Sequence, residues 1–366
     1  MKSRSFTLLA LLLMIGGTMQ AQLVKVEASE TIELMSILAR TAGFKEYRMD
    51  IAGKYTEETE EWFAPFESHP AVAYMQSLKP KYGIGYDAVA SMSLHTETDG
   101  KTVRLIDATT LEKRWKNINL DTCLMYINQF YTDTRFHEFY IQHQGFYEEG
   151  IQTYRNNVMQ YFHQDWYSQF YGMAPKETFT VIIGFTNGGG NYGTSRQFPD
   201  QKKEVFAIVG YSLNRETGKA FEHGGRYAST LIHEFNHSFV NPNLDEEANK
   251  ALLEPIGEDL YALTEWMMDW QAYKNATTVL NESIVRASVI IYMEENGFTA
   301  EQVKNEMYDQ LGRGFHWIPE LVSALKEYTH QRDKYPTFND FYPEIAKTLG
   351  SYVEKEHQRI DAALRK

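Results

Sequence analysis

The sequence predicts an α+β fold that is rich in helix and contains a small mixed or antiparallel sheet. Two β-branched runs, 179–184 and 204–211, lie close together in the middle of the chain, as is typical of buried strands. Before and after them, apolar residues recur at three- and four-residue steps, which is the period of amphipathic helices. The sheet is expected to lie beside the helix that follows the second run.

Residues 1–21 are predicted to be a secretory signal peptide. Lys2 and Arg4 give a basic start, an apolar run follows, and Ala21 offers a small residue at a cleavage point. The apolar run is too short to span a bilayer comfortably, and no cysteine follows it to carry a lipid. We therefore expect a secreted or periplasmic protein with no membrane span.

The remaining chain is expected to form two lobes that face a cleft. Residues 22–175 are predicted to be a mostly helical lobe, and residues 176–366 a lobe that carries the chemistry. Apolar spacing indicates the elements of the first lobe. They are a strand at 23–27 and helices at 29–40, 86–95 and about 132–171.

The second lobe begins with the two strands and the glycine-rich stretch 185–196 between them. We expect this stretch to be a mobile loop or hairpin tip near the cleft, because such connections lie at the surface. Its spacing Gly188-x-x-x-x-Gly193 is followed by Thr194, where a phosphate-binding loop requires lysine. A nucleotide site is therefore not expected.

The chain after the second strand is helical in pattern. A helix that follows Gly224-Gly225 is expected to stop at Asn241-Pro242, because a proline ring cannot continue the hydrogen-bond ladder. Later helices are predicted from about 246, with a disturbance at Pro255, and then at 278–296, from 299, at 319–331 and at 339–363.

Composition limits the partners. The formal net charge of −13 disfavours nucleic acid and anionic lipid, because an acidic surface repels phosphate. Cys123 is the only cysteine, so an internal disulfide and a cysteine metal cluster are both impossible. We expect Cys123 to be a buried, inert thiol.

The motif His233-Glu234-x-x-His237 carries the chemistry. On a helix, residues four apart project from one face, so the two imidazoles can share one metal ion. Glu234 stands beside the first histidine, where it can reach a water on that ion. The sequence therefore predicts a metal centre in the middle of this helix.

A third ligand is needed, because catalytic zinc usually takes three protein ligands. Glu282 is the best candidate: it lies on a helix that is apolar on nearly all sides, and a lone carboxylate there is costly unless it binds a cation. Arg286, one turn on, could be that cation instead. Glu254 and Glu258 are the alternative ligands.

His233-Glu234-x-x-His237 followed by Asn281-Glu282 resembles the gluzincin branch of the zincin metallopeptidases, whose third ligand often lies in a downstream Asn-Glu pair. The mature chain also resembles an uncharacterised family of secreted bacterial proteins that carry this motif. The resemblance implies a zincin-like fold and one Zn²⁺ held by His233, His237 and Glu282.

The resemblance also implies roles. Glu234 would be the general base of a secreted zinc peptidase that acts on a peptide or protein substrate. One of the two strands would offer its edge to an extended peptide, and 205–211 is preferred over 179–184. The donor to the oxyanion is left open among four residues, Tyr292, His316, His223 and Arg286.

Two other functions are compatible with the sequence. One is a zincin-like protein that binds a peptide or glycan without cutting it. The many aromatic side chains would suit such binding. Glu234 argues against this function, because a pure binder needs no general base. The other is a zinc hydrolase of a non-peptide bond. The oligomeric state is not predicted.

Overall fold

The computed structural model describes residues 24–49, 52–271 and 273–365. The expected signal peptide lies outside these residues. Within them, no helix is both long and apolar enough to cross a membrane. The buried apolar side chains form one continuous core cluster.

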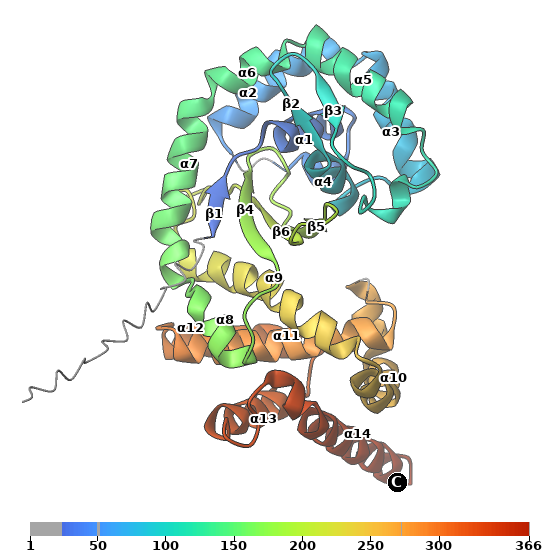
Figure 1. Cartoon of the computed structure of the whole chain (residues 1–366), viewed down its shortest axis with the longest axis vertical. Coiled ribbons are helices and arrows are strands. Elements are labelled where there is room, and N and C mark those ends of the chain that lie inside the picture. Colours follow the sequence, from blue (N-terminus) through green and yellow to red (C-terminus); the bar gives the residue numbers. More distant parts are fainter. Residues whose placement is uncertain (1–23, 50–51, 272, 366) are drawn as a thin grey trace, which may run out of the picture.

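A four-stranded mixed sheet stands at the centre of the molecule (Figure 1). Its strands are β1 (Lys25–Glu27), β4 (Thr178–Gly184), β5 (Tyr192–Arg196) and β6 (Glu204–Gly210), in the order β1-β4-β6-β5. β4 pairs in parallel with β1 and β6, whereas β5 pairs antiparallel with β6. The prediction of a small mixed sheet in a helix-rich fold is therefore confirmed.

The stretch between the two predicted strands differs from expectation. It was expected to be a mobile loop throughout, but residues Tyr192–Arg196 form the edge strand β5. The glycines before β5 are packed closely: a Cβ at Gly188 would overlap the backbone of Glu46, and one at Gly210 would overlap Gly189. Glycine is needed here because two backbones approach each other directly.

The helices form layers on either side of the sheet (Figure 1). α1 (Glu30–Thr41) and α4 (Asp87–Leu94) lie on one side, and α9 (Gly224–Leu244) lies on the other. The ring of Phe235 on α9 lies 4.3 Å from that of Phe179 on β4. α11 (Ala276–Glu295) packs on the far side of α9. This order places the motif helix between the sheet and the buried helix α11.

The prediction of one long helix at about 132–171 is wrong. Arg135 adopts a left-handed backbone conformation with φ of 53°, which ends one helix and starts the next. Further breaks fall at His143 and at 158–163. The segments are α5 (Leu120–Asp133), α6 (Phe136–Gln142), α7 (Gln144–Asn157), the 3₁₀ turn η4 (Met159–Tyr161) and α8 (Gln164–Tyr171).

The other N-terminal elements lie around the sheet in an arc (Figure 1). The expected helices at 29–40 and 86–95 are confirmed as α1 and α4. Further elements are η1 (Lys45–Tyr47), α2 (Lys54–Phe63), η2 (Ala64–Phe66), α3 (Pro70–Tyr82), η3 (Lys113–Trp115) and the hairpin of β2 (Thr96–Thr98) with β3 (Val103–Leu105). β1 comes from this half yet pairs with β4, so the sheet joins the two expected lobes.

Two prolines do not break their helices. α9 continues past Pro242 to Leu244, and α10 (Glu247–Trp270) continues through Pro255. Both prolines are exposed, so water can reach the carbonyl groups that lose their intrahelical partner. The remaining helices match the prediction: α12 (Ala300–Gly312), α13 (Ile318–His330) and α14 (Tyr342–Leu364), with the turn η5 (Phe338–Phe341).

Candidate metal centre

The motif helix α9 is amphipathic. Its apolar side chains are fully buried, and these are Ala228, Leu231, Ile232, Phe235 and Phe239. His233, Glu234 and His237 project from the opposite side and are half-buried. The 3.6-residue period therefore fixes which side of α9 faces the core and which side carries the candidate metal ligands.

Three ligand atoms converge beside α9. The Nε2 atoms of His233 and His237 lie 3.2 Å apart. Each of them lies 3.5 Å from one oxygen of Glu282, and all three ligand atoms fall within 4.8 Å of one another. The ligand atoms of a tetrahedral ion bound at 2.0–2.1 Å are separated by about 3.3 Å. The observed spacing fits a single ion of that kind.

The alternative carboxylates lie elsewhere. Glu254 and Glu258 are exposed on α10, whereas Glu282 is 8% exposed on α11. α11 packs directly against α9, and this contact brings Glu282 to the histidines. Among the described residues, the group that could hold a metal contains Glu282 and neither of the others.

Glu282 also forms an ion pair with Arg286. The sequence had offered this pair as the alternative to a metal ligand. Nη2 of Arg286 donates to Oε2 of Glu282 at 2.7 Å. The same guanidinium donates to Gln310 at 2.6 Å and to the hydroxyl of Tyr273 at 2.9 Å, and it lies over the ring of Phe315. Arg286 therefore fixes the orientation of Glu282, while the other carboxylate oxygen faces His237.

Two of the three groups are in protonation states that suit a metal. Burial lowers the pKa of His233 to about 3, so this imidazole stays neutral. Burial would raise the pKa of Glu282, but its hydrogen bond to His237 and the charge of Arg286 lower that pKa well below its usual range. Neutral imidazole nitrogen and ionised carboxylate are the forms that bind metal ions.

Asn241 controls the second histidine. Its Oδ1 lies 3.0 Å from Nδ1 of His237 and can accept the Nδ1 hydrogen, while Nε2 faces His233 and Glu282. Burial opposes protonation of His237, but the hydrogen bond and charge of Glu282 outweigh it and raise the pKa of His237. Such outer partners orient metal ligands.

Glu234 is not part of the triad. Its carboxylate lies against Gly193 on β5, where a Cβ would overlap Oε2 of Glu234. Burial raises its pKa above the ordinary value for a glutamate. A carboxyl group of this kind, next to a metal site and free of ligation, is suited to accept and return a proton.

The strand that was expected to offer a free edge to a substrate is a central strand of the sheet. β6 pairs with β4 on one side and β5 on the other, so the prediction that residues 205–211 offer a free edge is wrong. β5 pairs with β6 alone among the described strands and forms one edge of the sheet, and the short strand β1 forms the other. The run 204–211 was long and apolar because it is central, and a central strand has no free edge.

Of the four expected oxyanion donors, two are already engaged. The hydroxyl of Tyr292 is fully buried, donates to Tyr161 and accepts from the backbone of His163. Arg286 is held by the three partners described above. His223 and His316 are exposed, and neither belongs to the metal group within the described residues.

Sequence reasoning missed Tyr273. It lies in the short connection between α10 and α11, and its hydroxyl accepts from Arg286 at 2.9 Å beside Glu282. A Schellman-like hydrogen bond from its amide to the carbonyl of Met268 fixes this connection. The one available signal was its position directly before the helix that carries the third ligand.

Glu33 was missed as well. This fully buried residue of α1 accepts hydrogen bonds from the amide of Phe185 at 2.7 Å, the hydroxyl of Thr186 at 2.8 Å and the hydroxyl of Tyr55 at 3.1 Å. Burial raises its pKa to about 7. Phe185 and Thr186 begin the connection to β5, so Glu33 anchors the stretch that leads to Gly193.

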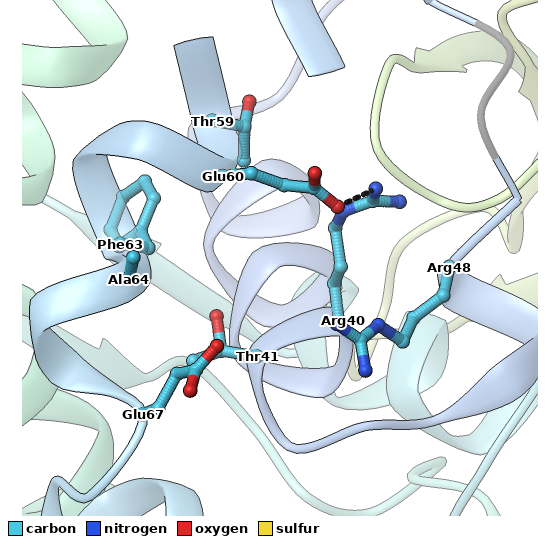
Figure 2. A pocket seen from close by; sticks show the side chains of 8 residues that line it. All are labelled: Arg40, Thr41, Arg48, Thr59, Glu60, Phe63, Ala64 and Glu67. Atoms are coloured by element: carbon cyan, nitrogen blue, oxygen red, sulfur yellow. Dashed lines mark hydrogen bonds and ion pairs between the residues drawn. The ribbon is translucent and has the colours of Figure 1, made fainter. Parts of the chain in front are cut away.

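A separate cavity of about 160 Å³ lies in the N-terminal half, between the end of α1 and α2 (Figure 2). Arg40 and Glu60 point toward one another across it and form an ion pair of 2.6 Å. Charged groups of both signs line it, which are Arg40, Arg48, Glu60 and Glu67. Residues of the metal group do not line it, so it is not the site of the predicted chemistry.

Comparison with known proteins identifies one family. The family model described as "Domain of unknown function (DUF4932)" matches residues 22–348. No curated protein and no solved structure matches the chain.

Proposed function

The chain belongs to the DUF4932 family, and on the geometry of its site we propose that it is an exported zinc-dependent peptidase. The observation that carries this proposal is the meeting of two imidazoles and one carboxylate at tetrahedral spacing, with Glu234 left unligated beside them. A metal-binding site without catalysis would not need that fourth group.

In this proposal His233, His237 and Glu282 hold the zinc ion. Zinc in such a set supplies a Lewis acid and lowers the pKa of its water toward 7. Arg286 keeps the carboxylate of Glu282 ionised and oriented. Asn241 keeps the acceptor nitrogen of His237 toward the ion.

Glu234 moves the proton. It takes one proton from the attacking water and gives it to the nitrogen of the leaving amine, so the carboxylate is regenerated at the end of the cycle. Its raised pKa brings its proton affinity closer to that of the groups with which it exchanges.

Tyr273 and β5 act on the substrate. The Tyr273 hydroxyl accepts from Arg286 and lies beside Glu282, and in this proposal its hydrogen turns to the carbonyl oxygen of the scissile bond when substrate binds. β5 runs over Glu234 and has one partner strand, and an extended peptide can pair with such an edge.

The test compares the zinc-loaded protein with its Glu234→Gln variant. Peptide mixtures are incubated with each, and the products are identified by mass spectrometry. We expect one zinc per chain in both proteins, and cleavage about 10²- to 10⁴-fold slower in the variant. Glu254→Gln, on the exposed side of α10, is the matched control and should cleave normally.

Three results would contradict the proposal in different ways. Equal cleavage by both proteins would show that Glu234 is not the general base. Peptides bound but never cut by the zinc-loaded protein would favour a binding function. Products released from a non-peptide bond would favour another class of zinc hydrolase.

A further inference from the structure

α10 presents two exposed tryptophans. Trp266 is 80% exposed and Trp270 is 85% exposed, one helical turn apart on the same face. Trp115, Trp166 and Trp317 are by contrast almost fully buried. Tryptophan is highly buried on average, because a solvated indole forgoes a large hydrophobic gain. Two of them together in solvent indicate a surface that is covered in another state of the protein.

The tryptophans end a longer stripe. Exposed residues recur at three- and four-residue steps along α10, and we call them the tryptophan face: Leu252, Pro255, Asp259, Ala262, Trp266 and Trp270. The stripe is about 27 Å long at 1.5 Å per residue. The stripe lies away from the buried side of α10, which holds Leu253, Leu260 and Met268, and five of its six residues are apolar although all six are exposed.

The surroundings of the tryptophan face are acidic. Residues 251–273 contain Glu254, Glu258, Asp259, Glu265 and Asp269 but no lysine or arginine. Within the described part of the chain, Asp269 has an ion-pair partner, Lys274 at 3.1 Å, and the other four have none. The face therefore combines aromatic rings with uncompensated negative charge.

We propose that the tryptophan face is a docking surface for a segment of the protein substrate that is rich in lysine and arginine. Cations bind over indole rings and to carboxylates, and this face offers both. A second copy of the chain is disfavoured as the occupant. It would bring the same carboxylates against each other, in a protein whose formal net charge is −13.

The C-terminal end of the face leads along the chain to a residue of the proposed catalytic site. Trp270 is followed, three residues later, by Tyr273, whose hydroxyl accepts from Arg286. α10 packs against α9 and α11, the two helices that carry the metal ligands. In this proposal, a chain held along α10 would reach the metal centre past the C-terminal end of that helix, where Tyr273 lies. This inference rests on the proposed peptidase function.

The test uses the full zinc-loaded chain and the Trp266→Ala/Trp270→Ala double variant. Both receive a short peptide with a cleavable bond, and the same peptide extended by a lysine- and arginine-rich segment. We expect KM for the extended peptide to rise about tenfold in the variant. This is the loss of affinity expected when cation–π contacts to both rings are removed. The kinetics on the short peptide should not change.

Charge provides a second arm of the test. Glu258→Gln/Asp259→Asn/Glu265→Gln should raise KM for the extended peptide in the same way, and high salt should do so in the wild type. Tyr308→Ala, another exposed aromatic that lies on α12, is the matched control. An unchanged KM for the extended peptide in both sets of variants would overturn the proposal.

Binding distinguishes this inference from the proposed function. The basic extension alone and an acidic peptide of equal length each carry a fluorescent label and are titrated with the zinc-loaded Glu234→Gln protein, while fluorescence anisotropy is recorded. Binding of the basic peptide that is weakened about tenfold by the added Trp266→Ala/Trp270→Ala substitutions supports docking even if no peptide is cleaved. Equal response to both peptides, or a dimer that the double variant abolishes, would overturn it.

Discussion

Gly193 of β5 lies directly against the carboxylate of Glu234 on α9, so closely that a Cβ at position 193 would overlap Oε2 of Glu234. The edge strand and the proposed general base therefore occupy adjoining space. No side chain larger than hydrogen fits between them without displacing one of the two. In the proposed mechanism, this contact makes the position of β5 matter for catalysis as well as for the sheet.

Gly193→Ala is expected to reduce cleavage while zinc stays bound. The added methyl group must push either β5 or the Glu234 carboxylate aside, and a displacement of 1 Å can cost about 10²-fold in rate. The measurement is kcat beside zinc content. Gly145→Ala is the control, because a Cβ there meets nothing within 4 Å. Full activity in Gly193→Ala would show that Glu234 tolerates displacement.

Tyr273→Phe is expected to lower kcat about 10- to 10³-fold with little change in KM, because a donor to the developing oxyanion acts in the transition state. Zinc content should remain at one per chain. Tyr261→Phe removes a hydroxyl that bonds Asp269 on α10 and serves as the matched control. If both variants keep wild-type kcat, the oxyanion donor is another group.

Glu282→Gln is expected to weaken zinc binding by more than the roughly 10- to 100-fold loss typical of outer partners. Glu254→Gln and Glu258→Gln should bind zinc normally, because both residues are exposed on α10. Metal content after dialysis against a chelator measures the difference. Since Glu282→Gln leaves Arg286 without its carboxylate, the double variant with Arg286→Gln separates lost ligation from lost folding.

Glu33→Gln is expected to change how stability depends on pH. Burial raises the pKa of Glu33 to about 7 from 4.5, so the folded state binds more protons between these values. The contribution of Glu33 to stability is present below about pH 4.5 and is lost as pH rises through 7, by up to about 3 kcal/mol. The glutamine variant does not titrate at this position.

Urea unfolding of wild type and Glu33→Gln between pH 5 and 8 measures this effect. The stability of the wild type relative to the variant should fall across that range. Glu148→Gln, an exposed residue of α7, should follow the wild type at every pH. A constant difference between wild type and Glu33→Gln would mean that Glu33 is ionised throughout.

The sequence alone determined those features that depend on neighbouring residues. The four-residue spacing of His233 and His237 placed both imidazoles on one side of α9, because helical periodicity is local. The apolar surroundings of Glu282 likewise predicted a buried carboxylate in need of a cation, and the structure gives it Arg286 and two histidines. Helices after 242 were found for the same reason, apart from the two exposed prolines.

Only the tertiary structure decided which distant groups meet. Glu282 rather than Glu254 joins the histidines because α11 packs on α9, and Tyr273 follows because its connection folds back toward Arg286. The edge strand β5 was not predicted, because it lies in a glycine-rich stretch whose composition is typical of a loop. Such contacts join residues far apart in the chain, and no local pattern encodes them, since they arise from the packing of whole elements around one core.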